Sequence, residues 1–222
     1  MLNDFLQPGL ILLITGLLIL VLHDVLVKAV SIAGPALTVI AVFIFETGES
    51  TDRLSMIFGI IFSLISLVAA VYNFHVKDKF ELAASAIYAG SSIGVVFSSH
   101  WIGMLIFWEL MAVASWLIVV SSRTEAAKKA GFRYLMVHML GGNLLLAGIV
   151  IKMGQGSELI ETLTGSGDAA YWLILAGVAV NAAIPPLNAW IADAYPESTM
   201  GGTVYMGSYT CLLYTSPSPR DS

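Results

Sequence analysis

Long, continuously apolar runs follow one another along the chain, and short polar or charged connections separate them. The runs lie at 8–26, 29–45, 54–74, 80–98, 101–121, 130–151 and 171–194, and an eighth run opens at Gly201. A helix of about 20 apolar residues crosses the hydrocarbon core of a bilayer, whereas the strands of membrane barrels alternate in polarity over about 10 residues. The pattern therefore predicts an all-α, polytopic bundle of seven transmembrane spans plus the start of an eighth.

The composition supports a membrane protein and removes several classes of function. The chain has 222 residues, of which 58% are hydrophobic and 11% charged, and its mean hydropathy is +0.86. Soluble proteins have about 25% charged residues. The seven runs leave no room for a soluble domain that could hold a nucleotide or a redox cofactor, so we expect no cofactor. A net charge of −5 with few, scattered basic residues excludes a nucleic-acid partner.

Known sequence signatures of catalysis are missing from the chain. It contains no phosphate-binding loop, no dinucleotide fingerprint, no zinc-protease motif and no nucleophile elbow. We therefore expect no catalytic centre and no metal site in this chain. Its single cysteine, Cys211, cannot form an intrachain disulfide.

Lysine and arginine concentrate in alternate connections. Seven of them lie in or beside the connections after the first, third and fifth runs (Lys28, Lys77, Lys79, Arg123, Lys128, Lys129 and Arg133), and two lie on the other side (Arg53 and Lys152). Basic residues favour the cytoplasmic side of a membrane. The connection between the fifth and sixth runs is thus predicted to be cytoplasmic and the N terminus outside. We expect a multi-pass protein of a prokaryotic cell membrane.

The seventh run is broken by two prolines. Pro185 and Pro186 follow only about 15 apolar residues, whose helical rise of about 22 Å is shorter than the hydrocarbon core. Two prolines remove two amide donors, so the carbonyl groups around Asn181 need other partners, for which the side chains of Asn181 and Asn188 are candidates. Irregular backbone at membrane depth usually lines a cavity. Asn181, Pro185, Pro186 and Asn188 are therefore candidates for the lining of a pore.

Two ionisable residues stand inside the spans. Glu109 lies near the middle of the fifth run, where a carboxylate costs at least about 2.5 kcal/mol and usually marks an ion or proton route. The alternative is a protonated glutamate that joins two helices. His138 in the sixth run can relay protons, or it can be a polar contact between helices. Gly141 and Gly142, one turn further along, are predicted to allow close helix packing.

Two stretches of sequence suggest a family. Residues 107–111 read Phe-Trp-Glu-Leu-Met, and residues 181–194 run from Asn181 through Pro185-Pro186 to Asp193-Ala194. Together they resemble the antiporter-like membrane subunits of respiratory complex I, of Mrp-type Na⁺/H⁺ antiporters (especially their D-type component) and of membrane-bound hydrogenases. The likeness covers roughly residues 80–210. It implies a half-channel built on the fourth to eighth spans, the first unit of an inverted repeat, in which Glu109 acts on a buried lysine of the seventh span.

The chain departs from that family at two positions. Asn181 stands where the resemblance implies the buried lysine, and Asn188 stands where it implies a histidine. An asparagine does not take up or release protons near neutral pH. The remaining candidates for a proton relay through water are Glu109 and His138.

Three functions stay open. The first is a subunit that conducts protons, alone or in exchange for Na⁺, within a hetero-oligomer of membrane subunits. The second is a non-conducting scaffold that docks partner subunits, which the asparagine at position 181 favours. The third is a conducting subunit of a redox-driven translocase in which electron transfer takes place in other subunits.

The chain divides into three expected segments. Residues 1–79 carry the first three spans, and residues 80–210 carry the antiporter-like repeat. Residues 211–222 are rich in serine, proline and arginine and cut the eighth span short after about seven apolar residues, far fewer than a span needs. This tail is similar to the translation of a sequencing adaptor, so we expect it to be non-native. A genuine polar tail is the alternative.

Overall fold

The computed structural model describes residues 6–45, 53–160, 163 and 167–210. The helices in this part of the chain are α2 (Gly9–Val21), α3 (Asp24–Phe45), α4 (Arg53–Tyr72), the short 3₁₀ helix η1 (Asn73–His75), α5 (Lys79–Phe97), α6 (Trp101–Val120), α7 (Glu125–Gly154), α8 (Ala169–Asn181), α9 (Ala189–Ala194) and α10 (Met200–Thr210). No strand forms among these residues. The predicted all-α class is confirmed, and the tail 211–222, including Cys211, lies outside the described residues.

The predicted count of seven spans is not supported by the described helices. Five helices of the described ranges are long and apolar enough to cross a membrane: α3, α4, α5, α6 and α7. The runs expected at 8–26 and 171–194 contain shorter helices, because α2 and α8 each have 13 residues. A helix of that length rises about 20 Å, against about 30 Å of hydrocarbon core. α2 stops at Val21 because Leu22 adopts an extended conformation.

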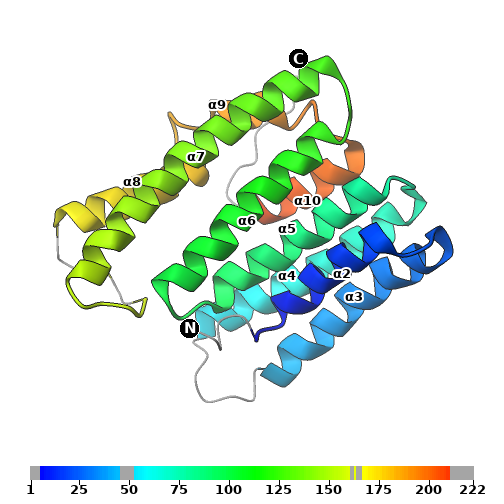
Figure 1. Ribbon diagram of the computed structural model, residues 1–222, viewed down its shortest axis with the longest axis horizontal. Helices are drawn as coiled ribbons and strands as arrows, with labels where there is room; N and C mark the ends of the chain where they lie inside the picture. The colour runs from blue at the N-terminus through cyan, green and yellow to red at the C-terminus, as the bar shows by residue number, and fades with distance from the viewer. Residues whose placement is uncertain (1–5, 46–52, 161–162, 164–166, 211–222) are drawn as a thin grey trace.

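The long helices lie side by side, with α3 and α2 at one edge and α7 and α8 at the opposite edge (Figure 1). α5 lies between them and packs against α2, α4, α6 and α10. Small residues on α5 permit this close packing. A Cβ atom at Gly90 of α5 would lie 2.8 Å from the carbonyl oxygen of Gly9 on α2, so the two backbones approach directly at this point.

The connections predicted to share one side of the membrane do meet at one end of the bundle. Lys79 pairs with Asp24, and Arg123 pairs with Asp78, each at 2.6 Å. Residues 195–199, which precede α10, join the same end, where the hydroxyl of Ser122 donates a 2.8 Å hydrogen bond to the carbonyl oxygen of Glu197. We call this end, made of residues 76–79, 121–124 and 195–199, the basic end. The grouping of these connections agrees with the pattern of basic residues.

The break after α8 starts one turn before the two prolines. α8 ends at Asn181, and Ala183 has a φ of 54°, which a helix does not accommodate. The indole Nε1 of Trp190 donates a 3.2 Å hydrogen bond to the carbonyl oxygen of Val180. A side chain from α9 therefore satisfies the end of α8. Of the two side chains expected as partners for this backbone, that of Asn181 makes no hydrogen bond within the described residues.

Candidate functional site

Two adjacent glycines of α7 face polar side chains from two other helices. A Cβ atom at Gly142 would overlap Oε1 of Glu109, which comes from α6. A Cβ atom at Gly141 would lie 2.7 Å from Nδ2 of Asn181, which comes from α8. The glycine pair thus leaves room for a carboxylate and an amide at neighbouring levels of the bundle. Sequence reasoning assigned this pair to close helix packing and missed its role beside polar groups.

Glu109 occupies the middle of α6 and is half-buried. Its carboxylate makes no hydrogen bond or ion pair to any other described residue, and it lies against the backbone of Gly142. His138 lies one helical turn before Gly142 on the same face of α7, a rise of about 6 Å. The structure therefore brings the two predicted ionisable residues to one face of one helix.

His138 is buried in an aromatic cluster. Its ring stacks on Tyr134 with centroids 4.0 Å apart and meets Trp190 edge-on at 4.6 Å. Nδ1 lies 3.2 Å from the carbonyl oxygen of Tyr134. The hydroxyl of Tyr134 donates a 2.7 Å hydrogen bond to Ser115. These contacts hold the imidazole of His138 in one orientation, with the second ring nitrogen available to water or another donor.

A cavity of about 210 Å³ opens beside this cluster. Its polar lining comes from five helices and comprises Tyr88, Ser92, Ser115, Tyr134, His138, Asn181 and Tyr209. Its apolar lining includes Phe62, Met111 and most of the Trp108 ring. Among the described residues, both polar atoms of the Asn181 side chain and Nε1 of Trp108 are buried without a hydrogen-bond partner. Most of the cavity surface is apolar, and a cavity of this size has room for several water molecules next to its polar groups.

The residues predicted for the pore lining and for proton translocation separate into two groups. His138 and Asn181 line the cavity. Pro185, Pro186 and Asn188 belong to the break between α8 and α9 and are not among the cavity-lining residues. Glu109 is not a lining residue either, although its neighbour Trp108 is. Tyr134 lies four residues before His138 on α7, so the sequence already places these two on one face. No signal in the sequence indicated that Ser115 and Trp190 would join them, because they come from α6 and α9.

The family described as "NADH:quinone oxidoreductase/Mrp antiporter, TM" matches residues 98–213. This match covers more than half of the chain and includes Glu109, His138 and Asn181. The chain belongs to this family. The family suggested by residues 107–111 and 181–194 is thereby confirmed.

Among curated relatives, hydrogenase-4 component B of Escherichia coli is 22% identical over 180 residues, which is 73% of this chain and 27% of that protein. The Na(+)/H(+) antiporter subunit A1 of Staphylococcus haemolyticus is 26% identical over 177 residues, which is 72% of this chain and 22% of that protein. The chain therefore spans about a quarter of the length of these relatives.

Solved structures share the fold. A chain of the membrane-bound sulfane sulfur reductase, an archaeal respiratory membrane complex, superposes with a TM-score of 0.76 at 17% identity, over 93% of this chain and 50% of that one. A chain of the Mrp complex from Dietzia sp. gives a TM-score of 0.71 at 22% identity, over 95% of this chain and 47% of that one. At these identities the likeness shows a common fold.

Proposed function

We propose that this chain is the proton-translocating part of a membrane subunit in a multisubunit antiporter or a complex I-like assembly. The observation that carries the proposal is the arrangement around Gly141-Gly142. Glu109 of α6 lies against the face of α7 that carries His138, and His138 lines a cavity next to unsatisfied polar atoms. A carboxylate and an imidazole beside a space for water are the parts that a proton relay needs.

The relay uses water between the two residues. Glu109 binds a proton on its carboxylate and releases it to a water molecule, and the proton then passes to the free ring nitrogen of His138. Asn181 orients water in the cavity with its amide and neither gains nor loses a proton. Na⁺ in exchange for protons is part of the same proposal, since a relative is described as a Na(+)/H(+) antiporter subunit.

The proposal also covers topology and organisation. The basic end faces the cytoplasm, the N terminus lies outside, and the protein resides in a prokaryotic cell membrane, as the bias of basic residues favours. Residues 1–79 form a peripheral group of helices, and residues 80–210 form the first antiporter-like repeat. Residues 211–222 are non-native. Other membrane subunits cover the exposed apolar side chains on α3 and α4, such as Val68 at 68% exposed.

A Glu109→Gln variant tests the proposal. Glutamine is isosteric with glutamate and cannot carry a proton, so proton movement through the assembled complex falls strongly, by about 100-fold for a lost proton-transfer group. The assay is quenching of a pH-sensitive dye in membrane vesicles that contain the complex. Glu125→Gln, which alters an exposed carboxylate at the start of α7, is the matched control and leaves transport unchanged. Full transport by Glu109→Gln contradicts the proposal.

The second candidate is a non-conducting scaffold. One observation favours it: Asn181, at the end of α8 and directly against Gly141, is uncharged and does not titrate. A scaffold predicts that proton movement by the complex survives the loss of both Glu109 and His138. Proton movement in a variant that lacks both Glu109 and His138 therefore distinguishes a conducting subunit from a scaffold.

A further inference from the structure

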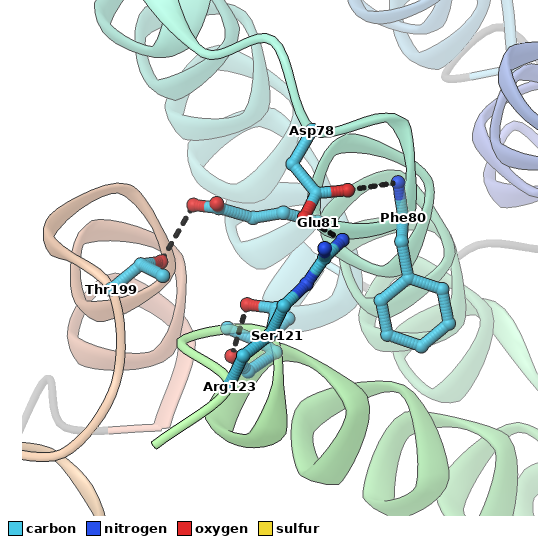
Figure 2. A network of polar contacts seen from close by, with 7 residues as sticks. Asp78, Phe80, Glu81, Ser121, Arg123 and Thr199 are labelled. Carbon is cyan, nitrogen blue, oxygen red and sulfur yellow. Dashed lines mark hydrogen bonds and ion pairs between the residues drawn. The ribbon is translucent and has the colours of Figure 1, made fainter.

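A second carboxylate, Glu81, is buried at the basic end. It is the third residue of α5 and is only 6% exposed. Figure 2 shows its side chain pointing from α5 towards Thr199, which lies just before α10. The hydroxyl of Thr199 donates a 2.6 Å hydrogen bond to Oε1 of Glu81. The hydroxyl oxygen of Thr199 also accepts a 3.0 Å hydrogen bond from the backbone amide of Gly202. This bond leaves the hydroxyl hydrogen of Thr199 directed at Glu81.

The nearby cations are bound to other groups. Arg123 pairs with Asp78 at 2.6 Å, beside Glu81 in Figure 2. Lys79 pairs with Asp24 and donates a 2.9 Å hydrogen bond to the carbonyl oxygen of Leu22. Glu81 has no ion pair within the described ranges. The buried carboxyl group therefore has the Thr199 hydroxyl as its side-chain partner in this part of the chain.

Asn73 supplies an acceptor for a proton on Glu81. Its Oδ1 is buried and has no hydrogen-bond partner among the described residues, while its Nδ2 donates a 3.3 Å bond to the carbonyl oxygen of Gly201. Oδ1 of Asn73 and Oε1 of Glu81 both lie against Cα of Gly201, because a Cβ there would contact the two oxygens. Oδ1 of Asn73 therefore lacks a hydrogen bond that a donor close to Gly201 would complete. A proton on Glu81 would be such a donor.

A polar face of α5 connects Glu81 to the cavity. Ser85, Tyr88 and Ser92 follow at helical spacings of four, three and four residues, so they lie on the same face as Glu81. Their exposed fractions are 2%, 1% and 3%. Tyr88 and Ser92 line the same cavity as His138. Ser92 lies about 16 Å along the helix from Glu81. The Oγ atom of Ser85 is buried and makes no hydrogen bond to the part of the chain that the structure describes.

We propose that Glu81 is a proton-binding residue at the basic end, and that Ser85 and Tyr88 pass its proton to the cavity that His138 lines. This inference rests on the proposed function. A proton leaves bulk water and binds the Glu81 carboxylate, where its O–H bond points to Asn73. It then moves to the hydroxyl oxygen of Ser85, directly or through one water molecule, and each hydroxyl releases one proton as it accepts another. Glu81 returns to the carboxylate form.

Ser85→Ala is the decisive variant, because the hydroxyl that it removes makes no hydrogen bond to a described residue. The variant folds and melts like the wild type, and a structural role predicts normal transport. A relay role predicts a several-fold lower rate of proton uptake by the whole complex in liposomes that contain a pH-sensitive dye. Glu81→Gln lowers the rate by about tenfold or more, since glutamine keeps the bond from Thr199 but carries no proton. Glu125→Gln is the control.

Two further measurements separate a proton role from a packing role. Azide, a small weak acid that carries protons, restores uptake in Glu81→Gln and not in Glu109→Gln, because position 109 lies away from bulk water. Infrared spectroscopy of the complex shows a protonated-carboxyl band that Glu81→Gln removes and Glu109→Gln retains. Wild-type uptake in both Ser85→Ala and Glu81→Gln overturns the inference. If Glu81→Gln fails to assemble, the rate of Ser85→Ala decides alone.

The same experiment distinguishes failure of this inference from failure of the proposed function. If Glu109→Gln stops transport while Ser85→Ala and Glu81→Gln do not, protons reach the cavity by another path and only this inference is wrong. If all three variants transport at the wild-type rate, the chain does not conduct protons and the proposed function is wrong as well.

Discussion

The carboxylate of Glu109 on α6 lies directly over Gly142 on α7, at a place where a Cβ atom would overlap Oε1. Glycine at position 142 is therefore a condition for the position of Glu109. His138, one turn earlier on α7, lines the adjacent cavity. The backbone of α7 thus positions both groups of the proposed relay.

We expect Gly142→Ala to displace the Glu109 side chain. The added methyl group overlaps the carboxylate end of Glu109, a flexible side chain that can swing away, so we expect proton transport to fall with little change in stability. Gly154→Ala is the matched control, because a Cβ at that position of α7 has no atom within 4 Å. The measurements are the melting temperature of the purified complex and its transport rate. Equal transport by the two variants contradicts the role of Gly142.

The indole of Trp190 closes the broken end of α8. Trp190→Phe retains an aromatic ring against His138 but removes the hydrogen bond to Val180, so we expect a loss of about 1 kcal/mol. Proteolysis within residues 182–188 becomes faster. Trp172→Phe, on the exposed surface of α8, is the control and leaves the cleavage rate unchanged. The same cleavage rate for Trp190→Phe and wild type shows that the hydrogen bond does not hold the break.

Close contact between α2 and α5 depends on Gly90. We expect Gly90→Ala to force the helices apart, because its methyl group would meet the carbonyl oxygen of Gly9 and Cβ of Leu12 within 3 Å. The expected cost is about 1–3 kcal/mol. Gly207→Ala on α10 adds the same methyl group where nothing lies within 4 Å. Thermal unfolding compares the two, and a Gly90→Ala protein as stable as Gly207→Ala contradicts the contact.

Asp168 makes the start of α8 sensitive to acid. A 2.9 Å hydrogen bond from the backbone amide of Tyr171, together with Lys152, holds the pKa of Asp168 below its ordinary value of 3.8. A depressed folded-state pKa means that the stabilisation is complete above the unfolded pKa and is lost as the pH falls through the folded value. We expect wild type to lose more stability than Asp168→Asn below about pH 4. Identical pH profiles of the melting temperature contradict this prediction.

The class of fold and the family could be predicted from local sequence. Continuous apolar runs are sufficient to predict membrane helices, and residues 107–111 with 181–194 identify the family. The number of spans could not be predicted from local sequence. Hydropathy shows where a run is apolar, but it does not show where the backbone leaves the helix. The run at 8–26 contains an extended residue, Leu22, that hydropathy does not register.

The candidate site could be predicted in part. Glu109 and His138 stand out because ionisable residues are costly in a bilayer. Glu109 comes near His138 because it lies against Gly142 of α7. The sequence does not show that contact, since Glu109 and Gly142 are on different helices. Glu81 does not stand out in the sequence, since it lies beside Lys79 at the end of a span and resembles an ordinary interfacial charge. Its burial depends on α10, which packs on it from more than a hundred residues away.

The central claim is that protons cross the membrane through this chain, and the most direct test is a Glu109→Gln/His138→Gln double variant in the complete complex. The complex is reconstituted in liposomes, and proton uptake is measured together with the amount of assembled subunit. We predict normal assembly with proton uptake reduced to the rate of protein-free liposomes. Uptake at the wild-type rate would contradict the claim and identify the chain as a scaffold.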